Sequence, residues 1–112
     1  MNPILCEKTL QQLAEDIGSD ILPELFAVFI EENEPKLERL PQLNVRQDLA
    51  ELQSLFHTLK SSAASYGGLR LAAFATDLDF ACKNEDYLKI EQMLPEFTQI
   101  YVQTLQVMRQ RY

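Results

Sequence analysis

Apolar residues recur at the spacing of one helix face in every segment of this chain, and they do not alternate as they would in a strand. This periodicity constrains the fold more than any other feature, because each amphipathic helix must bury its apolar stripe against another. Leu10, Leu13, Ala14 and Ile17 form the stripe of a first helix, which Gly18 is expected to end. Short connections favour antiparallel packing of consecutive helices.

Turn residues set the bounds of the next two helices. The Ser19-Asp20 pair is predicted to cap the second helix, and Pro35 removes a backbone hydrogen bond within it, so a kink or a break is expected there. Asn44, followed three residues later by Gln47, resembles a capping box that opens a third helix running to about Tyr66. The two glycines that follow are expected to end it.

Two further helices complete the predicted fold. A fourth helix precedes a turn at residues 84–86, and Pro95 should interrupt or bend a long fifth helix. The apolar stripes of these two helices are Leu71, Ala75, Leu78 and Cys82, then Ile90, Leu94, Phe97, Tyr101, Leu105 and Met108. The sequence therefore predicts an all-α protein: an up-down four-helix bundle with a short N-terminal helix capping one end, and residues 1–112 as a single domain.

Charge and composition exclude several classes of function. A net charge of −7 with ten scattered basic residues argues against binding to nucleic acid. No apolar run suits a membrane span or a secretion signal, so a cytoplasmic protein is expected. Cys6 and Cys82 lie far apart without a CxxC spacing and are interpreted as small buried hydrophobes. Without a glycine-rich nucleotide loop, any chemistry has to depend on very few groups.

The single histidine, His57, is predicted to lie on the outer face of the third helix. The apolar residues of that helix gather on the opposite side of a helical wheel: Leu52, Leu55, Phe56, Leu59, Ala63 and Tyr66. The neighbours of His57 on its own face are Gln53, Ser54, Lys60, Ser61 and Ala64. An ordinary solvated histidine is the plain alternative, but small neighbours, a lysine one turn on and a run of small residues favour a docking face.

An exposed imidazole beside a lysine suits phosphoryl transfer. An unperturbed histidine is largely neutral at pH 7, so one ring nitrogen has a lone pair that can attack phosphorus. Phosphoryl transfer asks a protein mainly for positioning and for neutralisation of the phosphoryl oxygens, and Lys60 supplies the charge. Lys60 is expected to act on the phosphate and not on folding. A metal site is disfavoured because no second histidine or thiolate stands at ligand spacing.

The run from His57 to Gly67 resembles the signature of histidine-containing phosphotransfer (HPt) domains. Those domains have an apolar residue two positions after the histidine, a lysine at three, small residues next and a glycine at ten. The order of helical segments also matches, so the resemblance covers nearly the whole chain. Within the family, Ser61 at the fourth position and the stretch 17–20 are similar to the free-standing quorum-sensing phosphorelay proteins of vibrios and their relatives.

The resemblance implies roles for individual residues. His57 would be the phosphoacceptor, modified at Nε2, and Lys60 would stabilise the phosphohistidine. Gly67 would allow close approach of a neighbouring helix or a partner. Ser61 stands where most of the family has glycine. Two alternatives stay open: its hydroxyl hydrogen-bonds the phosphate or the imidazole, or it has no such role. The expected partner contacts are Gln53, Ser54, Ser61, Ala64 and Gly67.

The resemblance also implies partners. A monomer would accept a phosphoryl group from the receiver domain of a hybrid sensor histidine kinase and pass it to the receiver domain of a response regulator. The chain would need no cofactor, because the receiver domains would supply Mg²⁺.

Two alternatives stay open: an adaptor that binds receivers without carrying phosphate, and an enzyme such as a histidine-dependent phosphatase. The intact His57–Lys60 pair argues against the first. The lack of a second acid or base near His57 argues against the second.

Overall fold

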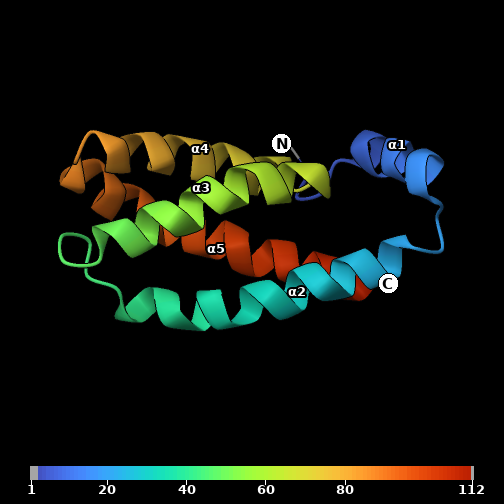
Figure 1. The fold of residues 1–112 in the computed structure, drawn as a ribbon, viewed down its shortest axis with the longest axis horizontal. Helices are drawn as coiled ribbons and strands as arrows, with labels where there is room; N and C mark the ends of the chain where they lie inside the picture. Colours follow the sequence, from blue (N-terminus) through green and yellow to red (C-terminus); the bar gives the residue numbers. More distant parts are fainter. Residues whose placement is uncertain (1–2, 112) are drawn as a thin grey trace.

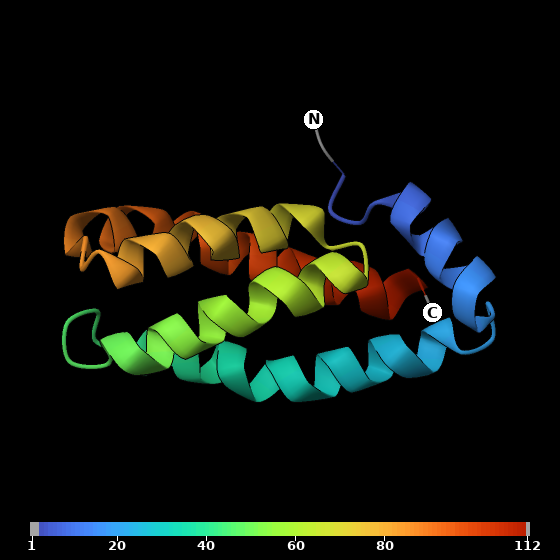
Figure 2. The same ribbon diagram turned by 45° about the horizontal axis from the view of Figure 1, so that its top comes forward.

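The computed structural model describes residues 3–111, in which every regular element is a helix. The helices are α1 (Glu7–Ile17), α2 (Leu22–Arg39), α3 (Leu49–Ser65), α4 (Leu69–Lys83) and α5 (Tyr87–Arg111), with a short 3-10 helix, η1 (Leu40–Gln42), after α2. Helices α2 to α5 form an up-down bundle, and α1 lies at one end of it (Figures 1 and 2). The predicted fold is confirmed. Met1, Asn2 and Tyr112, which belong to the expected domain of residues 1–112, lie outside the described residues.

The core is built from the apolar stripes that the sequence indicates. Leu52, Phe56 and Leu59 of α3 are at most 1% exposed. Phe56 meets Phe97 of α5 edge to face, with the ring centroids 5.1 Å apart, an arrangement that aromatic pairs favour. The ring centroids of Phe97 and Tyr101 are 5.5 Å apart. Because these contacts fix one face of α3 in the interior, the opposite face is turned to solvent.

Neither internal proline breaks its helix. Helix α2 continues through Pro35 to Arg39, and α5 continues through Pro95 to Arg111. Of the kink or break expected at Pro35 and the interruption or bend expected at Pro95, the break and the interruption do not occur. Both prolines are exposed, which lets water reach the carbonyl that loses its helical hydrogen bond. None of the described helices is both long and apolar enough to cross a membrane.

Two predicted caps serve turns and not helix ends. The Ser19-Asp20 pair lies in the turn before α2, which begins at Leu22 without a side-chain cap. Asn44 accepts hydrogen bonds from the N–H groups of residues 46 and 47 at 3.0 Å, as expected of a cap. The reciprocal bond comes from Asp48, whose Oδ2 accepts the Asn44 N–H at 2.8 Å, and α3 begins only at Leu49. The capping box with Gln47 was therefore wrong.

The turn between α3 and α4 confirms the glycine signal. The Gly68 N–H donates to the Ala63 carbonyl at 2.8 Å and the Gly67 N–H donates to the Ala64 carbonyl at 3.2 Å, which is the Schellman pattern. Gly67 has a φ of +84°, which favours glycine. The chain reverses here, so that α4 runs antiparallel along α3 (Figure 1). This brings the C-terminal half of α4 beside His57.

Candidate functional site

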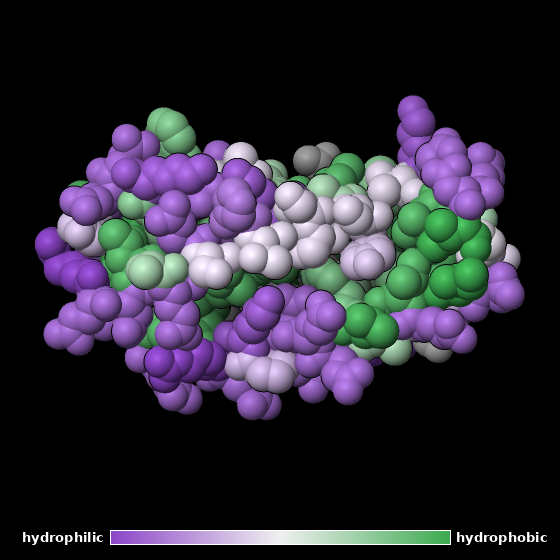
Figure 3. Space-filling model, in the orientation of Figure 1, coloured by the Kyte–Doolittle hydropathy of each residue, from purple (hydrophilic) through white to green (hydrophobic). Residues whose placement is uncertain are grey.

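His57 lies in the middle of α3, on the face that points away from the core. Its side chain is 62% exposed, whereas Phe56 before it is fully buried. A pale band of weakly polar side chains follows the course of α3 across the face drawn in Figure 3. The serines and the threonine of α3 account for this character. The helical wheel therefore placed the ring correctly.

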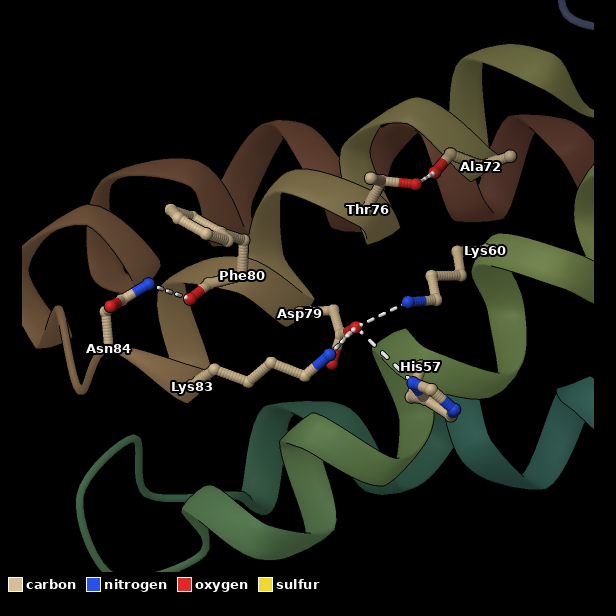
Figure 4. Close-up of polar contacts among 8 residues, drawn as sticks. All are labelled: His57, Lys60, Ala72, Thr76, Asp79, Phe80, Lys83 and Asn84. Atoms are coloured by element: carbon tan, nitrogen blue, oxygen red, sulfur yellow. Dashed lines mark hydrogen bonds and ion pairs between the residues drawn. The ribbon is translucent and has the colours of Figure 1, made fainter.

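A buried carboxylate on α4, Asp79, lies against the ring of His57. Asp79 is only 2% exposed, and its Oδ2 lies 3.4 Å from Nδ1 of His57. The same oxygen accepts a hydrogen bond from Nζ of Lys60 at 2.9 Å and lies 3.2 Å from Nζ of Lys83 (Figure 4). The other oxygen, Oδ1, is buried and has no hydrogen-bond partner among residues 3–111. Three groups thus converge on one oxygen of a buried acid.

The electrostatic balance keeps Asp79 ionised. Burial alone would raise the pKa of its carboxyl group, but the hydrogen bonds from Lys60, Lys83 and His57 outweigh burial and lower the pKa to about 2. A carboxylate facing Nδ1 favours the tautomer that carries its proton there, which leaves the lone pair on Nε2. Figure 4 shows this second nitrogen on the side of the ring away from Asp79. The site can therefore present Nε2 as a nucleophile.

Lys60 has a structural role that the sequence did not indicate. Its side chain is 30% exposed and donates to a carboxylate that is almost fully buried. Removing one cation from a buried ion pair leaves the anion less compensated, which costs stability. The expectation that Lys60 acts on the phosphate and not on folding treated it as an exposed lysine, whereas its contact with Asp79 predicts a part in folding as well.

The N-terminal half of α3 forms the open side of the site. Ala50, Gln53, Ser54 and His57 of α3 line an open hollow together with Lys83 of α4. Ser54 is exposed and Gln53 is half-buried. Ser61, on the other side of His57, is exposed as well, and its backbone carbonyl accepts a hydrogen bond from the Ser65 hydroxyl at 3.0 Å.

The C-terminal end of α3 is more covered than the sequence indicated. Ala64, expected on the open face, is half-buried and packs against the core. Gly67 is buried, and a β-carbon built on it would lie 3.3 Å from the Cys6 carbonyl oxygen and from Leu10. The close approach at Gly67 is therefore to the chain's own N-terminal segment, and the expected partner contact there stays a prediction. The helical wheel contains only the residues of α3, so it cannot show that α1 and the residues before it cover this end of the helix.

Sequence reasoning missed Asp79 and Lys83. The signal was present, because Asp79 follows Ala72 by seven residues and Ala75 by four, which places it along the buried stripe of α4. Charged residues are almost never fully buried unless they are paired, so an acid on this stripe predicts a cationic partner. Lys83, four residues further on, stands at the spacing of such a partner.

A helical bundle that presents an exposed histidine over a carboxylate and two lysines has the parts of a phosphotransfer protein. Residues 24–108 match the Hpt domain family. The chain is 38% identical over 85 residues to the phosphorelay protein LuxU of Vibrio vulnificus, an alignment that covers 76% of this chain and 74% of that protein. It is 32% identical over 100 residues to the phosphorelay protein LuxU of Vibrio cholerae, covering 89% and 88% of the two chains.

One solved structure has the same fold. The histidine-containing phosphotransfer protein B (HptB) of Pseudomonas aeruginosa superposes with a TM-score of 0.83 over 100% of this chain and 99% of its own, at 21% identity. That likeness bears on the fold alone. With the family match and the relatives, the conclusion is plain: this chain belongs to the Hpt domain family. It is a LuxU-like phosphorelay protein, a phosphocarrier and not a kinase, of the kind that relays phosphate between receiver domains.

Proposed function

We propose that this protein accepts a phosphoryl group on Nε2 of His57 from the receiver aspartate of a hybrid sensor histidine kinase. It then passes the group to the receiver aspartate of a LuxO-like response regulator in quorum sensing. The observation that carries the proposal is the exposed imidazole whose Nδ1 faces the buried carboxylate of Asp79, so that Nε2 is directed to solvent. Similarity to LuxU proteins supports the choice of pathway.

The two lysines provide the charge that the phosphoryl oxygens require. Phosphoryl transfer depends mainly on positioning and on charge neutralisation. Lys60 and Lys83 approach Asp79 from α3 and α4, and both contact its Oδ2 beside His57. Either lysine can turn from Asp79 to a phosphoryl oxygen while the other stays on the carboxylate. Mg²⁺ would come from the receiver domain.

A transfer assay tests the proposal. Incubation with a receiver domain carrying radiolabelled phosphate should give this chain a label that is labile in acid and stable in base, as a phosphohistidine is. The His57→Gln variant should take up no label while keeping the helical circular dichroism spectrum of the wild type. An adaptor that only binds receivers would form a complex without becoming labelled. Label of the same amount on His57→Gln would refute the assignment of the phosphoacceptor.

A further inference from the structure

The two lysines that contact Asp79 are not equivalent. Nζ of Lys60 lies 2.9 Å from Oδ2 and its side chain is 30% exposed, whereas Nζ of Lys83 lies 3.2 Å away and its side chain is 50% exposed. An ion pair that is open to water contributes little to stability, because the charges are screened and a long side chain loses freedom. Lys83 is therefore the lysine that can leave the carboxylate at the smaller cost.

Lys83 also borders the open space beside His57. It lines the hollow on the N-terminal half of α3, and the residues of 3–111 that line this hollow do not include Lys60. The residues that line it with Lys83 are Ala50, Gln53, Ser54 and His57. Figure 4 shows the two lysines reaching Asp79 from different helices, Lys60 from α3 and Lys83 from α4. A group bound at His57 on the side of the hollow therefore meets Lys83.

We propose that Lys83 binds the phosphoryl group on His57 while Lys60 stays on the buried carboxylate of Asp79. The inference deepens the proposed function and rests on it, because it concerns the phosphoryl group that His57 carries there. It gives different tasks to two lysines that contact the same oxygen, one holding the carboxylate and the other turning to the substrate. Lysine suits the turning part, since its ammonium group is a compact charge on a flexible four-carbon stem.

The charges of the site favour this exchange. Two ammonium groups lie beside Oδ2 of Asp79, one more than the single charge of the carboxylate requires. A protein-bound phosphoryl group carries a charge of roughly −1.5 to −2 at pH 7, so it attracts the spare cation. When Lys83 turns to the phosphoryl group, Asp79 keeps Lys60. If Lys60 turned instead, the buried carboxylate would keep only its more exposed partner, and weakening a buried ion pair costs stability.

Lys83 forms and breaks no covalent bond in the transfer. The Nε2 lone pair of His57 forms the N–P bond, the P–O bond of the partner's aspartyl phosphate breaks, and its electron pair goes to the partner's carboxylate. Lys83 keeps its protons and its charge, and its N–H groups donate to the phosphoryl oxygens. Its effect is electrostatic, because a cation placed at these oxygens stabilises the charge that they carry during transfer in either direction.

Direct chemical loading separates the role of Lys83 from the docking of a partner. Potassium phosphoramidate, a small donor that phosphorylates imidazole, loads the wild type and each variant, and phosphorus-31 NMR follows the phosphohistidine signal as the pH is varied. A nearby cation lowers the pKa of the phosphoryl group. Lys83→Ala should therefore raise this pKa and shorten the lifetime of the phosphohistidine. Lys83→Arg keeps the charge and should restore most of both.

Transfer from a phosphorylated receiver gives the second measurement. Lys83→Ala should slow it by roughly tenfold or more, the effect expected when a hydrogen bond between charged groups is lost. Urea unfolding verifies that each variant is folded under the assay conditions. Lys60→Ala should lower the unfolding midpoint more than Lys83→Ala does, because it removes the less exposed contact with Asp79.

The matched control is Lys89→Ala, which removes the same charge at an exposed position in the first turn of α5. It should leave the phosphorus signal, the lifetime and the transfer rate at wild-type values. A folded Lys83→Ala variant with the wild-type pKa of the phosphoryl group and the wild-type transfer rate would overturn the inference. A wild type that phosphoramidate loads but that no phosphorylated receiver labels would instead overturn the proposed function, and the phosphorus titration would still decide the contact with Lys83. A wild type that neither donor labels would overturn both.

Discussion

The free energy of unfolding should depend on Asp79 between about pH 4 and pH 2. The pKa of its carboxyl group falls from 3.8 to about 2 on folding, because the hydrogen bonds from Lys60, Lys83 and His57 outweigh the effect of burial. At 1.36 kcal/mol per pKa unit, this difference corresponds to about 2 kcal/mol of stability. The folded protein has the lower pKa, so the contribution is fully present above the unfolded value and disappears as the pH falls through the folded value.

Urea unfolding of the wild type and of Asp79→Asn at a series of pH values from 7 to 2 measures this contribution. Other carboxyl groups titrate in both proteins, so only the difference between their unfolding free energies reports on Asp79. That difference should move by about 2 kcal/mol in favour of the variant as the pH is lowered. Asp77→Asn shows the effect of the same change at an exposed site. Parallel curves for the wild type and Asp79→Asn across this range would show that the carboxylate is not held by the lysines.

Three further substitutions have defined outcomes. Lys60→Ala should lower the unfolding free energy by about 1 kcal/mol, because it removes a hydrogen bond to buried Asp79, and should speed the decay of labelled phosphohistidine. Tyr101→Phe should cost about 1–2 kcal/mol in urea unfolding, because the Tyr101 hydroxyl donates at 2.5 Å to the buried Asn33 side chain. Glu85→Gly should raise the thermal unfolding midpoint, with a gain of about 0.5–1 kcal/mol, because Glu85 has a φ of +52° after α4. A lower thermal unfolding midpoint would contradict the prediction for Glu85→Gly.

The parts of the fold that follow from local signals were predictable from the sequence. The stripe Leu71, Ala75, Leu78 and Cys82 is buried as its spacing indicates, and the turn at Gly67 has the geometry that glycine permits. Each of these features depends on residues within a few positions of one another. The helix starts were less predictable, because the side chains of residues 19, 20 and 44 can serve either a helix end or a turn.

The candidate site was only half predictable for a related reason. The exposure of His57 follows from the stripe of its own helix, so a wheel of that segment finds it. The contact of His57 with Asp79 joins residues 22 positions apart, and it depends on the register in which α3 and α4 pair. The burial of Gly67 likewise depends on where the N-terminal segment packs. Sequence periodicity predicts which face of a helix is buried, but it does not predict which segment packs against that face.

The arrangement of the site limits how a receiver domain can approach. Helix α1 lies beside the C-terminal end of α3, and its residues line a surface hollow with the exposed Ser65. The N-terminal half is open and carries the hollow formed by Ala50, Gln53 and Ser54 beside His57. We expect an incoming aspartyl phosphate to reach Nε2 of His57 from this half, where Lys83 also lines the hollow. Because Asp79 is already buried beneath the ring, docking can leave the carboxylate in place and needs only the half-exposed Lys83 to turn outward.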